Sequence, residues 1–199
     1  MSYLSALDNP AINRSGVRLV GDTKICRLVA DLNGLSQYMT IPKVDLVAGD
    51  VVRLKFIAPT SWSTVTNTYL LTGVGSTDHR LNVYSDAGVP KFAIGGYASA
   101  TTDGNPLPVV APTDGLEHTV TLTKTNAGDL SVIGARFTFD QLANSPIYDL
   151  KINDGSVYNY PIDDGFANNP VIRNAADPSG LTDGTAVNFT EATWIEVCK

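Results

Sequence analysis

Charged residues are scarce in this chain, and long apolar runs are missing. Only 17% of the 199 residues are charged, and the net charge is -6 at pH 7. An acidic chain without a lysine or arginine cluster lacks the positive field that binds nucleic-acid phosphates. No apolar run approaches the roughly 20 residues of a membrane-spanning helix. We therefore expect neither a nucleic-acid partner nor insertion into a membrane.

The first residues, MSYLSALDNPAINR, lack the basic segment followed by an apolar segment that marks a secretory signal. Together with the initiating methionine, this predicts a chain that is made and folded in a cytoplasm. Apolar residues make up 43% of the sequence, which is a globular balance. With so few charges, the polar surface is expected to come mainly from Ser, Thr, Asn and Gly.

Only two cysteines are present, Cys26 and Cys198, near opposite ends of the chain. In a chain without a secretory signal, such a pair is usually two reduced thiols that pack as small apolar side chains. The alternative is a disulfide, because the first and last strands of a sandwich are often neighbours. A loop that long would restrict the unfolded chain by roughly 4 to 5 kcal/mol. The sequence leaves both alternatives open.

The sequence is rich in short segments in which apolar and polar residues alternate. Val51 to Ile57 (VVRLKFI) places Val52, Leu54 and Phe56 on one face, as in a half-buried strand. Just before it, Asn33 to Pro42 reads as a glycine turn, a short strand and a proline stop. The expected strands are Lys24 to Ala30, Gln37 to Ile41, Val51 to Ile57, Thr68 to Thr72, Arg80 to Ser85, Lys91 to Ile94, Thr119 to Lys124, Leu130 to Ile133, Ile147 to Asn153, Ser156 to Ile162 and Thr193 to Val197.

Short connections between these strands predict antiparallel hairpins. Turn residues that tolerate positive φ stand at Asp86-Ala87-Gly88, at Asn126 to Asp129 and at Asp154-Gly155. Strands of this length and spacing, joined in this way, predict an all-β protein built as an antiparallel β-sandwich.

Helix is expected only as an accessory, and two segments read as long loops. The fair helical candidates are Phe139 to Ala143 and Tyr3 to Asp8, both at the length where isolated helix is marginal. Pro, Gly, Asn and Asp dominate Ser99 to Gly115 and Gly165 to Gly184, which predicts loops that carry function or move.

Several motifs follow one another in a fixed order from about Leu32 onward. They are Leu32-Asn33-Gly34 with Tyr38, Ile41 and Pro42; Ile133 to Arg136 followed by Ser145 to Ile152; Asn159 to Gly165; and Asp183 to Phe189 with Trp194. Over most of the chain these motifs resemble those of laminin-G-like, concanavalin-A-like jelly-roll domains, and in the C-terminal part they resemble those of tailed-phage virion proteins. The resemblance implies one laminin-G-like domain over residues 22–199, preceded by an N-terminal arm, residues 1–21. The chain departs from the family at Gln37, where an Asp is usual.

The resemblance implies a non-enzymatic structural protein of a tailed-phage virion: a capsid decoration, head-fibre or tail-associated adhesion module, assembled in the host cytoplasm. Its expected partners are other virion proteins and further copies of itself in a symmetric homo-oligomer. The alternative is a carbohydrate-binding, lectin-like module that recognises glycans on the host surface.

A lectin-like role would need exposed aromatic rings, since a ring face stacks on the apolar face of a sugar. Trp62, in a Ser/Thr-rich connection expected to be exposed, and Tyr97, after Gly95-Gly96, are the candidates for ligand binding. The alternative for both rings is ordinary packing in the core or at a subunit contact.

Metal and catalytic sites are not expected. The weak candidates for calcium ligands are Asp163, Asp164 and Asp183, and aspartates in Gly-rich segments are ordinary turn residues. The E-x-D-x-E pattern of retaining glycosidases is absent from the sequence, and the only glutamates are Glu117, Glu191 and Glu196. His79 and His118 lie in an ordinary turn and at the start of a strand, and no nucleophile elbow accompanies them. No cofactor is expected.

Overall fold

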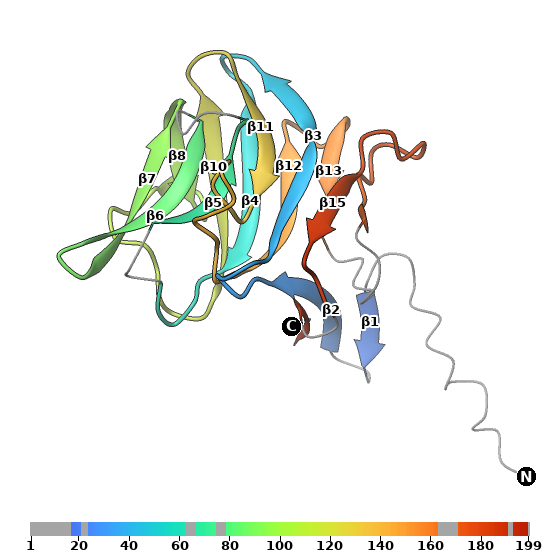
Figure 1. Cartoon of the computed structure of the whole chain (residues 1–199), viewed down its shortest axis with the longest axis horizontal. Helices are drawn as coiled ribbons and strands as arrows, with labels where there is room; N and C mark the ends of the chain where they lie inside the picture. The colour runs from blue at the N-terminus through green and yellow to red at the C-terminus, as the bar shows by residue number, and fades with distance from the viewer. Residues whose placement is uncertain are drawn as a thin grey trace, which may run out of the picture.

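Two antiparallel β-sheets make up the described part of the chain (Figure 1). The computed structural model describes residues 17–20, 24–62, 67–74, 79–162, 171–190 and 193–198. Within them, the larger sheet has nine strands: β1 (Val17–Val20), β2 (Lys24–Asp31), β4 (Val51–Ile57), β8 (Tyr97–Thr102), β9 (Asn105–Pro106), β10 (Glu117–Lys124), β12 (Pro146–Ile152), β13 (Tyr158–Tyr160) and β16 (Trp194–Cys198).

The second sheet has seven strands in the described residues. They are β3 (Tyr38–Leu46), β5 (Thr68–Thr72), β6 (Arg80–Asp86), β7 (Val89–Gly95), β11 (Gly128–Ile133), β14 (Val171–Ile172) and β15 (Gly184–Val187), in the order β14-β15-β3-β11-β5-β6-β7. The larger sheet runs in the order β1-β2-β12-β4-β10-β8-β9, with β13 beside β12 and β16 beside β2. The predicted antiparallel β-sandwich is confirmed.

The core lies between the sheets and follows the predicted alternation. In β4 the side chains of Val52, Leu54 and Phe56 are fully buried, and the residues between them are partly or fully exposed. Strand β10 alternates in the same way through Val120 and Leu122. Because successive side chains of a strand point to opposite faces, one face of each strand forms the core.

Pro42 does not end its strand, so the predicted proline stop is wrong. Strand β3 continues to Leu46, and its pairing with β11 shifts register, with Leu130 opposite Val44 but Val132 opposite Thr40. Pro42 lies in the extra length of chain that this irregularity accommodates. A bulge tolerates proline because its residues need not donate to the ladder.

Two of the three predicted hairpin turns are confirmed, and the third is wrong. Residues 86–88 connect β6 to β7, with positive φ at Ala87 and Gly88, and Asp154-Gly155 lies in the β12–β13 turn. The segment 126–129 is not a hairpin turn. It leads from β10 in the larger sheet to β11 in the second sheet, so the two strands do not pair.

The predicted helix over Phe139 to Ala143 is wrong. Ala135 forms an isolated bridge with Leu142, and the Phe139 amide donates to the Arg136 carbonyl in a tight turn. The Tyr3 to Asp8 candidate lies outside the described residues. No helix in the part of the chain that the structure describes is long and apolar enough to cross a membrane.

Both ends of the described chain meet in one extension of the larger sheet. Strand β2 pairs with β1 along one side and with β16 along the other, and only Ala30 and Asp31 of β2 pair with β12. Figure 1 shows this terminal extension (β1, β2 and β16) at the lower end of the molecule, whereas the β3–β4 connection lies at the upper end. Strand β1 falls within the predicted N-terminal arm.

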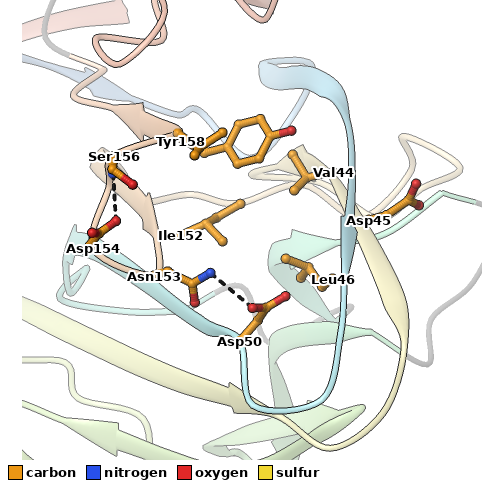
Figure 2. A pocket seen from close by; sticks show the side chains of 10 residues that line it. Val44, Asp45, Leu46, Asp50, Ile152, Asn153, Asp154, Ser156 and Tyr158 are labelled. Carbon is orange, nitrogen blue, oxygen red and sulfur yellow. Dashed lines mark hydrogen bonds between the residues drawn. The ribbon is translucent and has the colours of Figure 1, made fainter.

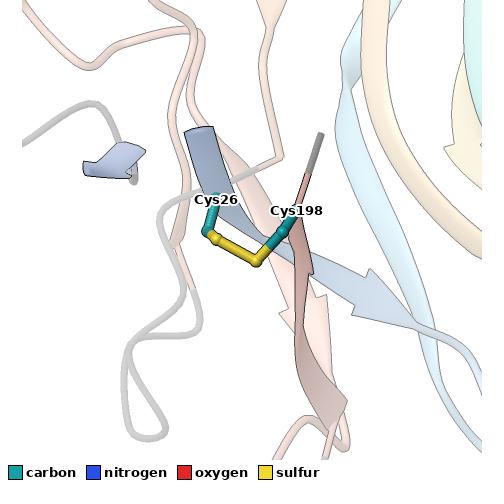
Figure 3. Close-up of a disulfide and its surroundings, with 2 residues drawn as sticks. All are labelled: Cys26 and Cys198. Atoms are coloured by element: carbon teal, nitrogen blue, oxygen red, sulfur yellow. A yellow bond between two sulfur atoms is a disulfide. The ribbon is translucent and has the colours of Figure 1, made fainter. Parts of the chain in front are cut away.

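Cys26 and Cys198 form a disulfide in the terminal extension (Figure 3). They are directly opposite one another in the β2–β16 register, 172 residues apart in sequence. The expectation of two reduced thiols is therefore corrected. The physical reason is topological, since the first long strand and the last strand are neighbours.

Candidate functional site

The candidate site is a cavity of about 440 Å³ at the end of the sandwich opposite the terminal extension. It opens between β3 of one sheet and the β12–β13 hairpin of the other (Figure 2). The lining residues are Val44, Asp45, Leu46, Asp50, Ile152, Asn153, Asp154, Ser156, Val157 and Tyr158. Concave sites of this size at the edge of a scaffold are typical places for small ligands.

The floor of the cavity is apolar. Val44 and Leu46 point into it from β3 and Ile152 from β12, and all three are buried (Figure 2). Asp45 points to the other side of β3, as the alternation of a strand requires, and its carboxylate lies 2.7 Å from Lys43 Nζ. Tyr158, partly buried, contributes an aromatic ring beside this floor.

Asn153 and Asp50 form a fixed polar rim. Asn153 has a positive φ of 56°, and its Oδ1 accepts a hydrogen bond of 2.9 Å from the Val51 amide. Its Nδ2 donates to Asp50 Oδ1 over 3.0 Å, and Asp50 Oδ2 accepts from the Val47 amide over 2.8 Å. These bonds tie the β3–β4 connection to the β12–β13 turn, so the rim groups are held in place before any ligand arrives.

Asp154 adds a second carboxylate to the rim. Hydrogen bonds from the Ser156 hydroxyl and amide lower the pKa of Asp154, because they favour the charged form. The rim therefore offers carboxylate and amide groups that accept hydrogen bonds from hydroxyls, above an apolar floor with one aromatic ring. This arrangement suits a polyhydroxylated ligand with an apolar face, such as a sugar.

The structure places Trp62 in the core rather than on the surface. The side chain is 4% exposed, its Nε1 donates to the Pro112 carbonyl over 2.8 Å, and its ring packs against Phe56 at 6.0 Å between centroids. The expected exposure of Trp62 is therefore wrong. A tryptophan between two turn-rich segments looks like a surface residue in sequence, but here it closes one end of the core.

Tyr97 is also buried, at 8% exposure, and Lys124 Nζ lies 4.7 Å from the centre of its ring. Burial raises the pKa of the Tyr97 hydroxyl, since the phenolate would be poorly solvated. Neither Tyr97 nor Trp62 presents an exposed ring face to a ligand. The aromatic ring at the cavity is instead that of Tyr158, which sequence analysis placed in a strand without a role.

Of the three aspartates considered as calcium ligands, only Asp183 lies within the described residues. Asp163 and Asp164 lie outside the described residues. Asp183 holds the segment before β15, because its Oδ1 accepts from the Asn174 amide over 2.8 Å and its Oδ2 lies 4.0 Å from Arg173 Nη1. Asn174 is itself buried and bonded to neighbouring backbone, so Asp183 serves loop structure.

His118 lies between two carboxylates, a cluster that sequence reasoning missed. Its Nδ1 is 2.7 Å from Asp103 Oδ2, and its Nε2 is 3.1 and 3.2 Å from the two oxygens of Asp114. Burial works to lower the pKa of His118, but hydrogen bonds to Asp114 and Asp103 outweigh it and raise the pKa. We call these three residues the His118 clasp. It joins the β8–β9 turn to the chain that enters β10.

Lys124 is a buried lysine, 2% exposed, whose Nζ lies 2.5 Å from His79 Nδ1. Burial lowers the pKa of Lys124, with the charge of Asp129 acting the other way. The alternation in β10 carried a signal for this burial, since Val120, Leu122 and Lys124 share one face of the strand. A charged residue at the end of an apolar stripe is easily taken for the point where the stripe reaches solvent.

No protein-family model, no curated protein and no solved structure matches this chain.

Proposed function

We propose that this chain is a non-enzymatic structural protein of a tailed-phage virion, acting as a capsid decoration, head-fibre or tail-associated adhesion module. In this role the terminal extension attaches the chain to the virion, and the opposite end of the sandwich, which carries the cavity, faces away from the virion. The motifs that resemble tailed-phage laminin-G-like domains and the weakly charged, polar sequence support this assignment.

The observation that carries the proposal is the course of β12. Its first residues, Pro146 and Ile147, pair with β2 of the terminal extension, and its last residue, Ile152, lines the cavity. At about 3.3 Å per residue the two ends of this strand lie roughly 20 Å apart. Strand β12 thus runs from the end that carries β1 and β16 to the end that carries the cavity.

Assembly through the anchored end is tested by light scattering with a matched pair of variants. Leu35 and Val47 are both exposed apolar residues, Leu35 in the connection after β2 and Val47 in the β3–β4 connection at the far end. We expect the wild type to form a symmetric homo-oligomer, Leu35→Asp to weaken it and Val47→Asp to leave it intact. A wild type that stays monomeric at high concentration, or a larger loss with Val47→Asp, would contradict the proposal.

The second candidate is a carbohydrate-binding module that recognises host-surface glycans, and the cavity favours it. Its apolar floor, the Tyr158 ring and the polar rim of Asp50 and Asn153 are the elements that a sugar site combines. This function is compatible with anchoring at the other end.

A glycan array, read with and without calcium, tests this candidate. We expect Tyr158→Ala to abolish binding and Tyr84→Ala, a strand tyrosine in β6 away from the cavity, to preserve it. Binding unaffected by Tyr158→Ala would exclude the cavity as the site. Sugar binding by a chain that stays monomeric would reverse the ranking of the two functions.

A further inference from the structure

The disulfide in the terminal extension lies beside a carboxylate. Cys26, Cys198 and Glu196 offer ligand atoms that all lie within 4.8 Å of one another, and they are the one such group of three among the residues that the structure describes. Cys198 and Glu196 are two residues apart on β16, so both project from the same face of the strand. Cys26 faces them from the register position opposite Cys198.

We propose that this group is a metal site in the reduced protein, in which two thiolates and the Glu196 carboxylate bind zinc. Zinc takes thiolate ligands at about 2.3 Å and carboxylate oxygens at about 2.0 to 2.2 Å, so two ligand atoms of a tetrahedral site lie about 3.5 to 3.8 Å apart. The ligand atoms of Cys26, Cys198 and Glu196 all lie within 4.8 Å of one another, so the group is close enough to adopt this arrangement once the sulfur atoms separate on reduction. Small side-chain rotations bring all three onto one ion, and water completes the tetrahedron.

Zinc is favoured because the ligand set is mainly soft. Two thiolates select zinc over calcium and magnesium, which prefer oxygen ligands throughout. Access is open, since Glu196 and Cys198 are exposed although Cys26 is buried. The backbone pairing from Cys26–Cys198 to Ala30–Trp194 fixes the two strands independently of the sulfur chemistry.

The oxidised and metal-bound states are exclusive. A thiol reductant converts the disulfide to two protein thiols and is itself oxidised to a disulfide, a two-electron exchange. The two thiols then bind Zn²⁺ as thiolates and release two protons. In a reducing compartment zinc would hold β16 against β2, and in an oxidising one the disulfide takes over the same position.

Cobalt(II) titration tests the site, because thiolate coordination gives Co²⁺ a charge-transfer absorption that zinc then displaces. The full chain is reduced with a dithiol and desalted under argon before the titration. We expect one Co²⁺ per chain in the reduced protein, none in the oxidised protein and none in the Cys26→Ser/Cys198→Ser double variant.

The role of the carboxylate is tested by Glu196→Gln, with Glu117→Gln at the start of β10 as the matched control. We expect Glu196→Gln to lower the metal affinity of the reduced protein at least about tenfold and Glu117→Gln to leave this affinity unchanged. Hydrogen exchange gives a second readout, since zinc should restore protection of the β16 amides in the reduced wild type. Equal affinity in Glu196→Gln and wild type, one metal shared by two chains, or no binding by the reduced protein would each overturn the proposal.

Discussion

At the scale of single residues, the His118 clasp predicts a pH-dependent contribution to stability. The pKa of His118 is raised in the folded protein, so its contribution is fully present below the ordinary imidazole pKa of about 6.5 and is lost as pH rises through the higher folded value. We expect the stability difference between wild type and His118→Gln to be largest below about pH 6.5 and to shrink as the pH rises above it. Urea unfolding of both proteins on both sides of this pH measures it.

The acid side of the same clasp depends on Asp114. Hydrogen bonds from the Leu116 amide and from His118 hold its pKa below the ordinary value, so its contribution is present above about pH 4 and is lost as pH falls through the lowered pKa. A difference between wild type and His118→Gln that stays constant from pH 5 to 9 would contradict this account of the clasp.

Trp62 carries the second prediction at this scale. Trp62→Ala removes a buried ring and leaves the Pro112 carbonyl without its indole donor, so we expect a loss of about 3 to 5 kcal/mol in the free energy of unfolding. Leu181→Ala, at an 85% exposed position, should change it by less than about 0.5 kcal/mol. Equilibrium denaturation compares the two, and near-equal stabilities would mean that the ring does not close the core.

Residue-level features were the least predictable from sequence. A strand over Ile147 to Asn153 was expected, and Asn153 instead lies in the turn that follows β12. The hydrogen bonds of its side-chain amide to Val51 and Asp50 join two segments about 100 residues apart. His118 was correctly placed near the start of a strand, yet its partners Asp103 and Asp114 come from a segment that read as one long loop. Pairings of this kind are set by the packing of loops, and no local pattern encodes them.

At the scale of elements, Gly134 at the end of β11 is expected to be intolerant of a side chain. It has a φ of 79°, and an added Cβ would overlap Leu32 Cδ1, which is buried in the core. Gly104, in the β8–β9 turn, has a φ of 80° with no atom within 4 Å of an added Cβ. Comparing Gly134→Ala with Gly104→Ala therefore separates the cost of backbone strain from the cost of steric overlap.

In both alanine variants the positive φ alone is expected to lower the free energy of unfolding by roughly 1 kcal/mol or more. In Gly134→Ala, overpacking against Leu32 is expected to lower it by about 1 to 3 kcal/mol more. Thermal or urea unfolding gives the two values. If the two substitutions lower the free energy of unfolding equally, Gly134 would be needed only for the turn geometry, and its close approach to Leu32 would not affect stability.

Strands with strong apolar patterns were predicted well, and weakly patterned ones were missed. Strands β4, which alternates, and β5, which is buried throughout, both have the predicted bounds. Most of β8 was assigned to a loop and β15 was not predicted, since Thr, Ser, Ala and Gly make up most of both strands. Their place in the sheets depends on pairing with β10 and β3. The same limitation explains Pro42, whose tolerance depends on a register shift against β11.

At the scale of the whole molecule, the Cys26–Cys198 bond closes almost the entire chain into one loop. Replacing both cysteines with serine is expected to lower the free energy of unfolding by roughly 3 to 5 kcal/mol, since the unfolded chain regains the freedom that a long closed loop removes. Urea unfolding of the oxidised wild type and the double variant, with a metal chelator present, measures the difference. A cost below about 1 kcal/mol would mean that the pairing of β2 with β16 suffices without the bond.

The two-layer architecture was predictable because it rests on many weak signals that agree. Alternation in strands such as β4 and β10, and glycines at the turns, point to antiparallel pairing independently of one another. The sequence did not show that the first and last strands pair, because no local pattern indicates which strands far apart in sequence become neighbours. Only the folded arrangement brings Cys26 and Cys198 together.

The disulfide also determines how the molecule would bear mechanical load. Tension applied at the two termini would pass from β2 to β16 through a covalent bond and bypass the strands that lie between Cys26 and Cys198 in sequence. The intervening 172-residue span, roughly 600 Å of extensible chain, would stay folded under forces that unzip ordinary strand pairs. Single-molecule stretching would show that length only after the bond is reduced.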